Sequence, residues 1–226
     1  MNNRQGQWES SYKNQDNFMF YPDDEVIRFV SKYIRKKIGP SEFVDLSQTA
    51  TTDRILDLGC GIGRHVIFLS EMGLDGYGID LSKTAVQTAV KRAPHLGKKI
   101  IHGDAIRLPW DDKYFQFAIS HGTLDSMTFP MAQNVCLELS RVMAPGGLYY
   151  CDLISGDDSF HAREYHGEET VNTRHEQGTI QSYFNIEKIN KMIGDLFFIE
   201  ECLLIKRYNI FSGDFLARYH VVFRKK

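Results

Sequence analysis

The sequence predicts an α/β fold in which seven strands form a mainly parallel sheet, with an antiparallel last strand and helices on both faces. Apolar segments of strand length alternate with amphipathic helical segments along most of the 226 residues. Such alternation produces right-handed βαβ units, whose parallel strands are covered by helices. The chain has no internal repeat, low-complexity tract or Pro/Gly-rich linker, so we expect one domain spanning residues 1–226.

The elements of the first half follow from apolar periodicity and from residues that begin or end helices. An amphipathic helix is predicted over 23–38, because its apolar residues share one stripe and Gly39-Pro40 ends it, and a polar linker is predicted over 41–52. Ser82 is a good N-cap and Pro94 a stop for a later helix. The alternating series is then expected as a strand at 54–58, a helix at 64–72, a strand at 76–80, a helix through Ala93 and a strand at 99–102.

The second half continues the alternation and ends differently. We expect a strand at 115–120, a helix at 131–143, a strand at 148–153, a polar segment at 155–178 and a helix at 186–196. Two final strands near 197–206 and 214–223 follow each other directly, so they can pair antiparallel.

Bulk properties exclude several classes of protein. A formal net charge of -2 gives no general attraction to nucleic acid, so no nucleic-acid partner is expected. The four cysteines lie far apart without metal-ligand spacing, which favours reduced thiols and no metal site. The first twenty residues lack the apolar core of a signal peptide, and no run approaches the roughly 18 apolar residues of a membrane span. We therefore expect a cytoplasmic monomer or homodimer with no membrane partner.

The most informative stretch is 54–64, where a buried-strand pattern breaks into three glycines, Gly59, Gly61 and Gly63, and leads into an apolar helix. Glycine permits positive φ in a tight turn and lets a ligand approach the backbone. A turn that binds the pyrophosphate of a dinucleotide reads G-x-G-x-x-G, whereas this chain reads D-x-G-x-G-x-G from Asp57. The acidic groups around the turn suit a sulfonium cation better than a pyrophosphate.

This turn resembles motif I of the class I S-adenosylmethionine-dependent methyltransferases that act on small molecules. Three later segments also resemble landmarks of that family, at 77–82, 102–104 and 138–147, so the resemblance covers about residues 54–154. It implies a Rossmann-like sheet, methyltransferase activity, S-adenosylmethionine as cofactor and S-adenosylhomocysteine as product. It divides the domain into a helical and aromatic cover (1–40), a cofactor-binding core (54–154), a substrate-covering insertion (155–180) and a C-terminal helix with antiparallel strands (181–226).

The cofactor-binding residues are expected at the carboxyl ends of the parallel strands. Asp80, 23 residues after Asp57, is placed to accept hydrogen bonds from ribose hydroxyls, and capping of the following helix is the alternative. By the resemblance, Asp104 reads the adenine amino group and Ala105 presents its N–H to a ring nitrogen, while Asp57 either orients the turn or makes a purely structural hydrogen bond. The full predicted set is Asp57, Gly59, Cys60, Gly61, Gly63, Arg64, Asp80, Leu81, Asp104, Ala105, Ser120 and His121.

Residues that handle the acceptor are expected in three places. After the strand at 115–120 the chain lacks the Asn/Asp-Pro-Pro-Tyr/Phe sequence often found in enzymes that methylate a base amino group. His121 is a candidate general base there; the alternative is that it packs along the cofactor or hydrogen-bonds the backbone. The polar segment 155–178 supplies two further candidate bases, His161 and His175. Substrate contacts are expected from that segment and the N-terminal cover, at Tyr12, Tyr21, Arg163, Tyr165 and Arg174.

Together these features predict methyl transfer to an oxygen or nitrogen of a small polar, anionic metabolite of carboxylate, phosphate or nucleotide-sugar type, because arginines accompany the candidate bases. The main alternative is an RNA or protein methyltransferase recruited through a partner. An NAD-dependent oxidoreductase and a nonenzymatic regulator that binds S-adenosylmethionine are further alternatives.

Overall fold

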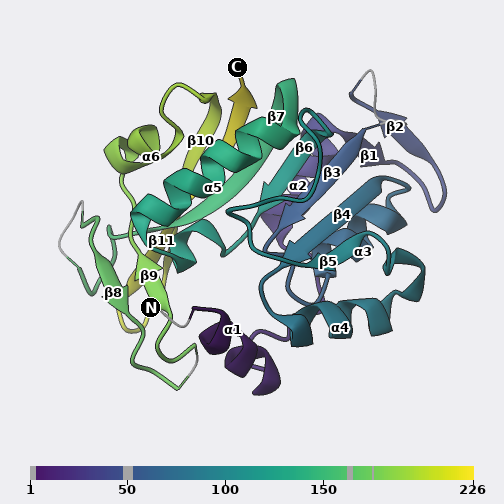
Figure 1. Ribbon diagram of the computed structural model, residues 1–226. Coiled ribbons are helices and arrows are strands. Elements are labelled where there is room, and N and C mark those ends of the chain that lie inside the picture. The colour runs from purple at the N-terminus through teal and green to yellow at the C-terminus, as the bar shows by residue number, and fades with distance from the viewer. Residues whose placement is uncertain (1–3, 48–52, 162–164, 175) are drawn as a thin grey trace.

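A computed structural model describes residues 4–47, 53–161, 165–174 and 176–226 of the protein (Figure 1). Its centre is a seven-stranded sheet with the order β10-β11-β7-β6-β3-β4-β5. Strands β3 to β7 pair in parallel, and β11 pairs antiparallel with both β7 and β10. The bounds are β3 (Arg54–Leu58), β4 (Asp75–Asp80), β5 (Ile100–His102), β6 (Phe115–Ser120), β7 (Met143–Ser155), β10 (Phe197–Tyr208) and β11 (Phe215–Lys225). The predicted mainly parallel sheet with an antiparallel last strand is confirmed.

Helices cover both faces of this sheet because successive residues of a buried strand point to opposite sides. On β6, Phe117 and Ile119 pack into the core beneath α2 and α3, whereas Ala118 packs into the core beneath α5 and α6. Helix α4 packs beside α3 over a smaller cluster that includes Val86 and Ile100. The helical elements are α1 (Arg4–Lys13), α2 (Asp24–Tyr33), α3 (Arg64–Glu71), α4 (Lys83–Arg92), α5 (Phe129–Val142) and α6 (Ile186–Ile193), with 3-10 turns η1 (Pro94–Leu96) and η2 (Leu124–Ser126). No helix in the described parts of the chain is long and apolar enough to cross a membrane.

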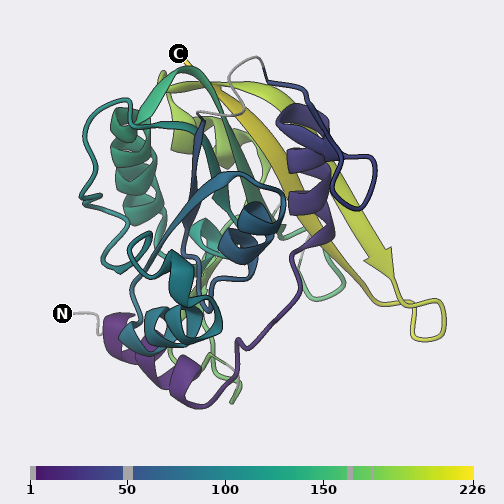
Figure 2. The same cartoon turned by 90° about the vertical axis from the view of Figure 1, so that its right-hand side faces the viewer.

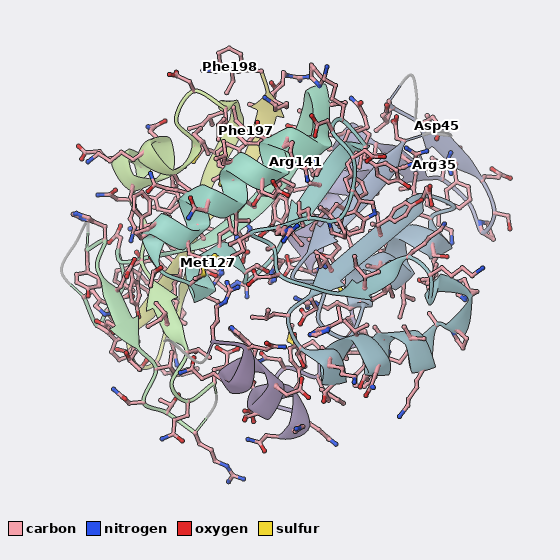
Figure 3. All side chains as sticks on the ribbon, in the orientation of Figure 1. Arg35, Asp45, Met127, Arg141, Phe197 and Phe198 are labelled. Carbon is pink, nitrogen blue, oxygen red and sulfur yellow. The ribbon has the colours of Figure 1, made fainter. Side chains whose placement is uncertain are left out.

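The helix predicted over 23–38 ends earlier, at Tyr33. The chain continues into a small antiparallel hairpin of β1 (Arg35–Lys37) and β2 (Phe43–Asp45), which replaces the helix end and part of the predicted linker. The reason is the buried side chain of Arg35, which donates to Asp45 and to the carbonyl oxygens at the end of α3 (Figure 3). A helical continuation would remove that guanidinium from its acceptors, and a sequence pattern does not reveal such a long-range bond.

Two further elements were not predicted. Helix α1 has no strong apolar stripe, yet it lies against α4 at the edge of the sheet (Figure 2). A second hairpin is formed by β8 (Glu168–Thr170), within the segment predicted as polar, and β9 (Ile180–Ser182), which follows that segment. Both elements lie near the carboxyl ends of the parallel strands, where a ligand site is expected.

Candidate functional site

The glycine turn joins the carboxyl end of β3 to α3. Its three glycines have positive φ values, 75° at Gly59, 52° at Gly61 and 79° at Gly63. A Cβ atom on Gly59 would overlap the side chain of Thr123, and one on Gly61 would lie 2.5 Å from the hydroxyl oxygen of Tyr12. The turn therefore requires glycine both for its backbone conformation and for the close approach of neighbouring groups.

Two cavities open side by side along this edge. The smaller, of about 80 Å³, is lined by the last residue of β4, Asp80, and by residues that follow β4 and β5, namely Leu81, Gly103, Asp104 and Ala105. The larger, of about 250 Å³, is lined by residues of the turn, of the segment that follows β6 and of β11, including Cys60, Gly61, Arg64, His121, Asp125 and Arg218. Five residues line both cavities: Trp8, Tyr12, Gly59, Gly122 and Ser126. The two cavities thus share a common wall.

Nine of the twelve predicted cofactor residues line one or both of these cavities, and three lie behind them. Gly63 forms the N-cap of α3, and Ser120 is buried at the end of β6. Asp57 is also buried, and its Oδ2 has no hydrogen-bond partner among the described residues. This oxygen lies 3.6 Å from Nδ1 of His65. A buried, incompletely satisfied carboxylate beneath the turn fits a cationic ligand above it.

Asp80 connects the turn to the smaller cavity. Its Oδ2 accepts from the backbone N–H of Gly61, and its Oδ1 accepts from that of Ser82, both at 2.8 Å. Ser82, not Asp80, is the N-cap of α4, because its hydroxyl oxygen accepts from Ala85 N–H. Burial raises the pKa of Asp80 to about 6, although both backbone hydrogen bonds act to lower it. Each carboxylate oxygen has a second lone pair, so the group can still accept ribose hydroxyls.

Asp104 lies at the other end of the smaller cavity. Its Oδ2 pairs with the guanidinium of Arg4 on α1 at 2.5 Å, and its Oδ1 accepts from Ile106 N–H. An adenine amino group that reaches Asp104 would therefore share the carboxylate with Arg4.

Helix α1 forms part of the wall of both cavities. Trp8 and Tyr12 line both cavities, as two of the aromatic residues expected in the N-terminal cover. Glu9 fixes the helix in place, since its carboxylate accepts from the hydroxyls of Ser82 and Thr84 and from Thr84 N–H at the start of α4. The hydrogen bond from the Thr84 side chain is the main reason that the pKa of Glu9 is lowered to about 2.

His121 lies on the wall of the larger cavity and is held from both sides. Its Nε2 is 2.9 Å from Asp23 Oδ2 and 3.5 Å from Asp152 Oδ2, and its Nδ1 is 3.1 Å from Nη2 of Arg64. Burial lowers the pKa of His121, but the carboxylates of Asp152 and Asp23 outweigh burial and raise the pKa above its ordinary value. Arg64 also donates to the carbonyl oxygen of Tyr21.

Arg218 on β11 is a site residue that the sequence analysis missed. Its guanidinium lies 2.5 Å from Asp125 Oδ2 and 2.7 Å from Asp152 Oδ2. The antiparallel direction of β11 places its first residues beside the last residues of β7, with Arg218 opposite Ile154. The predicted antiparallel last strand was the available signal, because the beginning of such a strand lies at the edge where the parallel strands end.

The structure does not bring Tyr21, His161, Tyr165 or Arg174 to either cavity. His161 pairs with Asp158 and Glu169 and stacks on Tyr165 at a centroid distance of 4.6 Å. Tyr21 is 82% exposed, and Arg174 borders a separate hollow on the outer side of α1. The predictions for Arg163 and His175 lie outside the described residues. The segment contributes Val171, Glu176 and Ile180 to the larger cavity instead.

Comparisons with known proteins agree with this site. Residues 56–151 match the family model described as a methyltransferase domain. The chain is 29% identical over 133 residues to a demethylmenaquinone methyltransferase of Bacillus mycoides, covering 56% of this chain and 55% of the relative. It is 26% identical over 154 residues to a sterol 4-C-methyltransferase of Caenorhabditis elegans, covering 63% of this chain and 43% of the relative. The chain spans about half the length of the curated relatives it matches.

Solved structures support the same assignment at the level of the fold. A SAM-dependent methyltransferase from Methanosarcina mazei superposes with a TM-score of 0.65 at 22% identity, over 77% of this chain and 93% of that one. Geranyl diphosphate C-methyltransferase from Streptomyces coelicolor A3(2), in complex with S-adenosyl-L-homocysteine, gives a TM-score of 0.57 at 13% identity over 78% and 72%. The fold and the turn define a SAM-dependent methyltransferase domain. Residues 56–151 therefore carry a methyltransferase domain, and the fold around them is that of the class I S-adenosylmethionine-dependent methyltransferases, whose cofactor is S-adenosylmethionine.

Proposed function

We propose that this protein transfers the methyl group of S-adenosylmethionine to an oxygen or nitrogen of a small polar, anionic metabolite of carboxylate, phosphate or nucleotide-sugar type. The observation that carries the proposal is the larger cavity, which adjoins the smaller one and has Arg64 in its lining. In the same proposal the enzyme acts in the cytoplasm, as a monomer or homodimer and without nucleic acid.

The cofactor would lie across both cavities. Its adenosine part would occupy the smaller one, with the ribose on Asp80 and the adenine on Asp104, and its methionine part would follow the turn at Gly59 and Gly61. Bound S-adenosylmethionine supplies a methyl group on a positively charged sulfur. Methyl transfer is an in-line displacement, so the protein mainly has to align the acceptor and exclude water. Trp8 and Tyr12 line both cavities and would help exclude water.

Arg64 supports an anionic acceptor. Its Nη1 donates to Tyr21 and its Nη2 to His121, two of the five N–H donors that a guanidinium carries. These contacts hold the side chain at the wall of the larger cavity, where it can bind a carboxylate or phosphate. The two arginines of the insertion do not support an anionic acceptor, since Arg174 borders another hollow and Arg163 lies outside the described residues.

The names of the relatives suggest a second type of acceptor. One relative is named for demethylmenaquinone and another for a sterol. Trp8, Ile62 and Ile180 give the larger cavity apolar surface as well as its charges. An acceptor with an apolar ring beside its polar group would suit both kinds of surface.

The test is transfer of radiolabelled methyl groups to a cell metabolite extract, with small molecules and macromolecules separated afterwards. We expect the label among the small molecules that an anion-exchange resin retains. Arg64→Gln should reduce the label at least tenfold while S-adenosylhomocysteine still binds in calorimetry. Arg54→Gln is the matched control, because Arg54 lies at the opposite end of β3 against Tyr114. Label in RNA or protein alone would contradict the small-molecule acceptor, and label in uncharged lipids would contradict the anionic one.

A further inference from the structure

A cluster of charged groups lies beside the larger cavity. It contains three carboxylates, two guanidiniums and one imidazole, from Asp23, Asp125, Asp152, Arg64, Arg218 and His121. With the carboxylates ionised and the imidazole neutral, three negative charges face two positive ones. The cluster can therefore take up one proton without acquiring a net positive charge. The hydrogen bonds within it show which atom is available to receive that proton.

His121 is poorly placed to take a proton from an acceptor. A guanidinium N–H can only donate, so the contact with Arg64 uses the lone pair on Nδ1 of His121. The other ring nitrogen, Nε2, then carries the hydrogen and donates it to Asp23. Both ring nitrogens are engaged, which gives His121 the role of a link between Arg64 and Asp23.

Asp152 is also fully engaged. Its Oδ1 accepts from Gly122 N–H at 2.6 Å, and its Oδ2 accepts from Nε of Arg218 at 2.9 Å and pairs with Nη2. The side chain is completely buried and does not line the cavity. Asp152 therefore acts as the fixed counter-charge of Arg218.

Asp125 differs from both groups. Its Oδ2 accepts from Ile154 N–H and pairs with Arg218, whereas its Oδ1 is buried without a hydrogen-bond partner among the described residues. The residue is 4% exposed and belongs to the lining of the larger cavity. It lies in the 3-10 turn after β6, next to Ser126 on the wall that both cavities share. An unpartnered buried acceptor at this position calls for a donor from the ligand.

We propose that Asp125 is the general base of the transfer, an assignment that rests on the proposed function. The lone pair of the acceptor oxygen or nitrogen forms the bond to the methyl carbon, and the carbon–sulfur bond breaks with its electron pair remaining on sulfur. The proton of the acceptor passes to Oδ1 of Asp125, so the sulfonium charge and the carboxylate charge disappear together. Arg218 is the positioning residue that fixes the orientation of the carboxylate through Oδ2.

The surroundings of Asp125 increase the basicity of its carboxylate. Burial raises its pKa, the guanidinium of Arg218 from β11 lowers it, and Asp152 from β7 raises it, so that the pKa lies above its ordinary value. His121, which follows β6, is the other titratable group that acts on Asp125, and it lowers the pKa. A carboxylate whose pKa is raised accepts a proton more readily in the transition state.

Asp125→Asn tests the assignment, because it keeps the size of the side chain and removes its basicity. With saturating cofactor, we expect methyl transfer to a metabolite extract to fall about 100-fold or more, while S-adenosylhomocysteine affinity stays within threefold. Asp158→Asn is the matched control, since Asp158 is a buried aspartate that holds His161 outside both cavities. That variant should retain at least half of the activity. Asp125→Glu should recover part of the lost rate.

The outcomes separate this assignment from the proposed function. Transfer by Asp125→Asn within threefold of the wild-type rate would overturn the role of Asp125 and leave the methyltransferase intact. A wild-type protein that labels neither fraction would overturn the proposed function and the base with it. Should Asp125→Asn not fold, the wild-type pH profile at saturating cofactor decides the matter. A rate that declines as the pH falls, in a range above the ordinary titration of an aspartate, supports the assignment, and a rate that stays flat down to about pH 4 overturns it.

Discussion

Replacing Asp80 with asparagine should weaken cofactor binding while leaving the fold intact. The carboxylate accepts from two backbone N–H groups at 2.8 Å and lines the smaller cavity, where it can also accept the ribose hydroxyls. An asparagine keeps one oxygen acceptor, loses the charge and turns an NH₂ group toward one of these donors. The loss of charge-assisted hydrogen bonds of this kind is worth about 1.5–3 kcal/mol. The affinity for S-adenosylhomocysteine should therefore fall roughly 10- to 150-fold.

Calorimetric titration with S-adenosylhomocysteine measures the change, and thermal unfolding without ligand measures the stability of the variant. Asp75→Asn is the matched control, because Asp75 lies on the same strand at the opposite end, where it pairs with Lys99. That variant should bind the ligand with wild-type affinity. An unchanged affinity in Asp80→Asn would refute the reasoning, and it would leave Asp80 with the purely structural task of holding the Gly61 and Ser82 amides.

Three further predictions concern the same edge of the sheet. Ribose hydroxyls donate to the ionised form of Asp80, and burial raises the pKa of Asp80 to about 6. The affinity for S-adenosylhomocysteine should therefore decline as the pH falls below 6. Equal affinities at pH 5 and pH 8 would contradict this prediction. Gly61→Val should abolish detectable binding, whereas Gly146→Val, which also has positive φ but open space at its Cβ, should lower stability by about 1–3 kcal/mol without affecting binding. Glu9→Gln should increase hydrogen exchange within residues 4–13, since it weakens the bonds to Ser82 and Thr84, and unchanged exchange would show that other contacts hold α1.

The parallel core was predictable because each of its strands and helices carries its own local signal. Buried apolar runs mark the strands, Ser82 caps α4, and the glycines mark the turn with three residues of positive φ. The strand of Asp57 and that of Asp80 pair in register, so both acidic residues reach the same edge of the sheet. Most of the predicted cofactor residues lie together for this reason.

The errors arose where a distant partner decides the local structure. The β1–β2 hairpin depends on the hydrogen bonds of Arg35 to Asp45 and to the end of α3. The position of α1 depends on the hydrogen bond between Glu9 and the start of α4. The polar density of the 155–178 segment indicated a functional loop, but His161 is held there by Asp158 and Glu169, outside both cavities. Residue type and local density do not give the direction in which a side chain points.

Nine of the 19 residues that line the larger cavity lie outside the segment that matches the methyltransferase family model, residues 56–151. Trp8 and Tyr12 come from α1, and Arg218 comes from β11. Within the segment, His121 is held by Asp23, which precedes α2, and Arg64 is held by His121. The matched segment supplies the glycine turn and most of the smaller cavity, and the N-terminal and C-terminal parts complete the larger one. The acceptors named for the relatives therefore do not determine the acceptor here, because part of the wall of the larger cavity comes from beyond the matched segment.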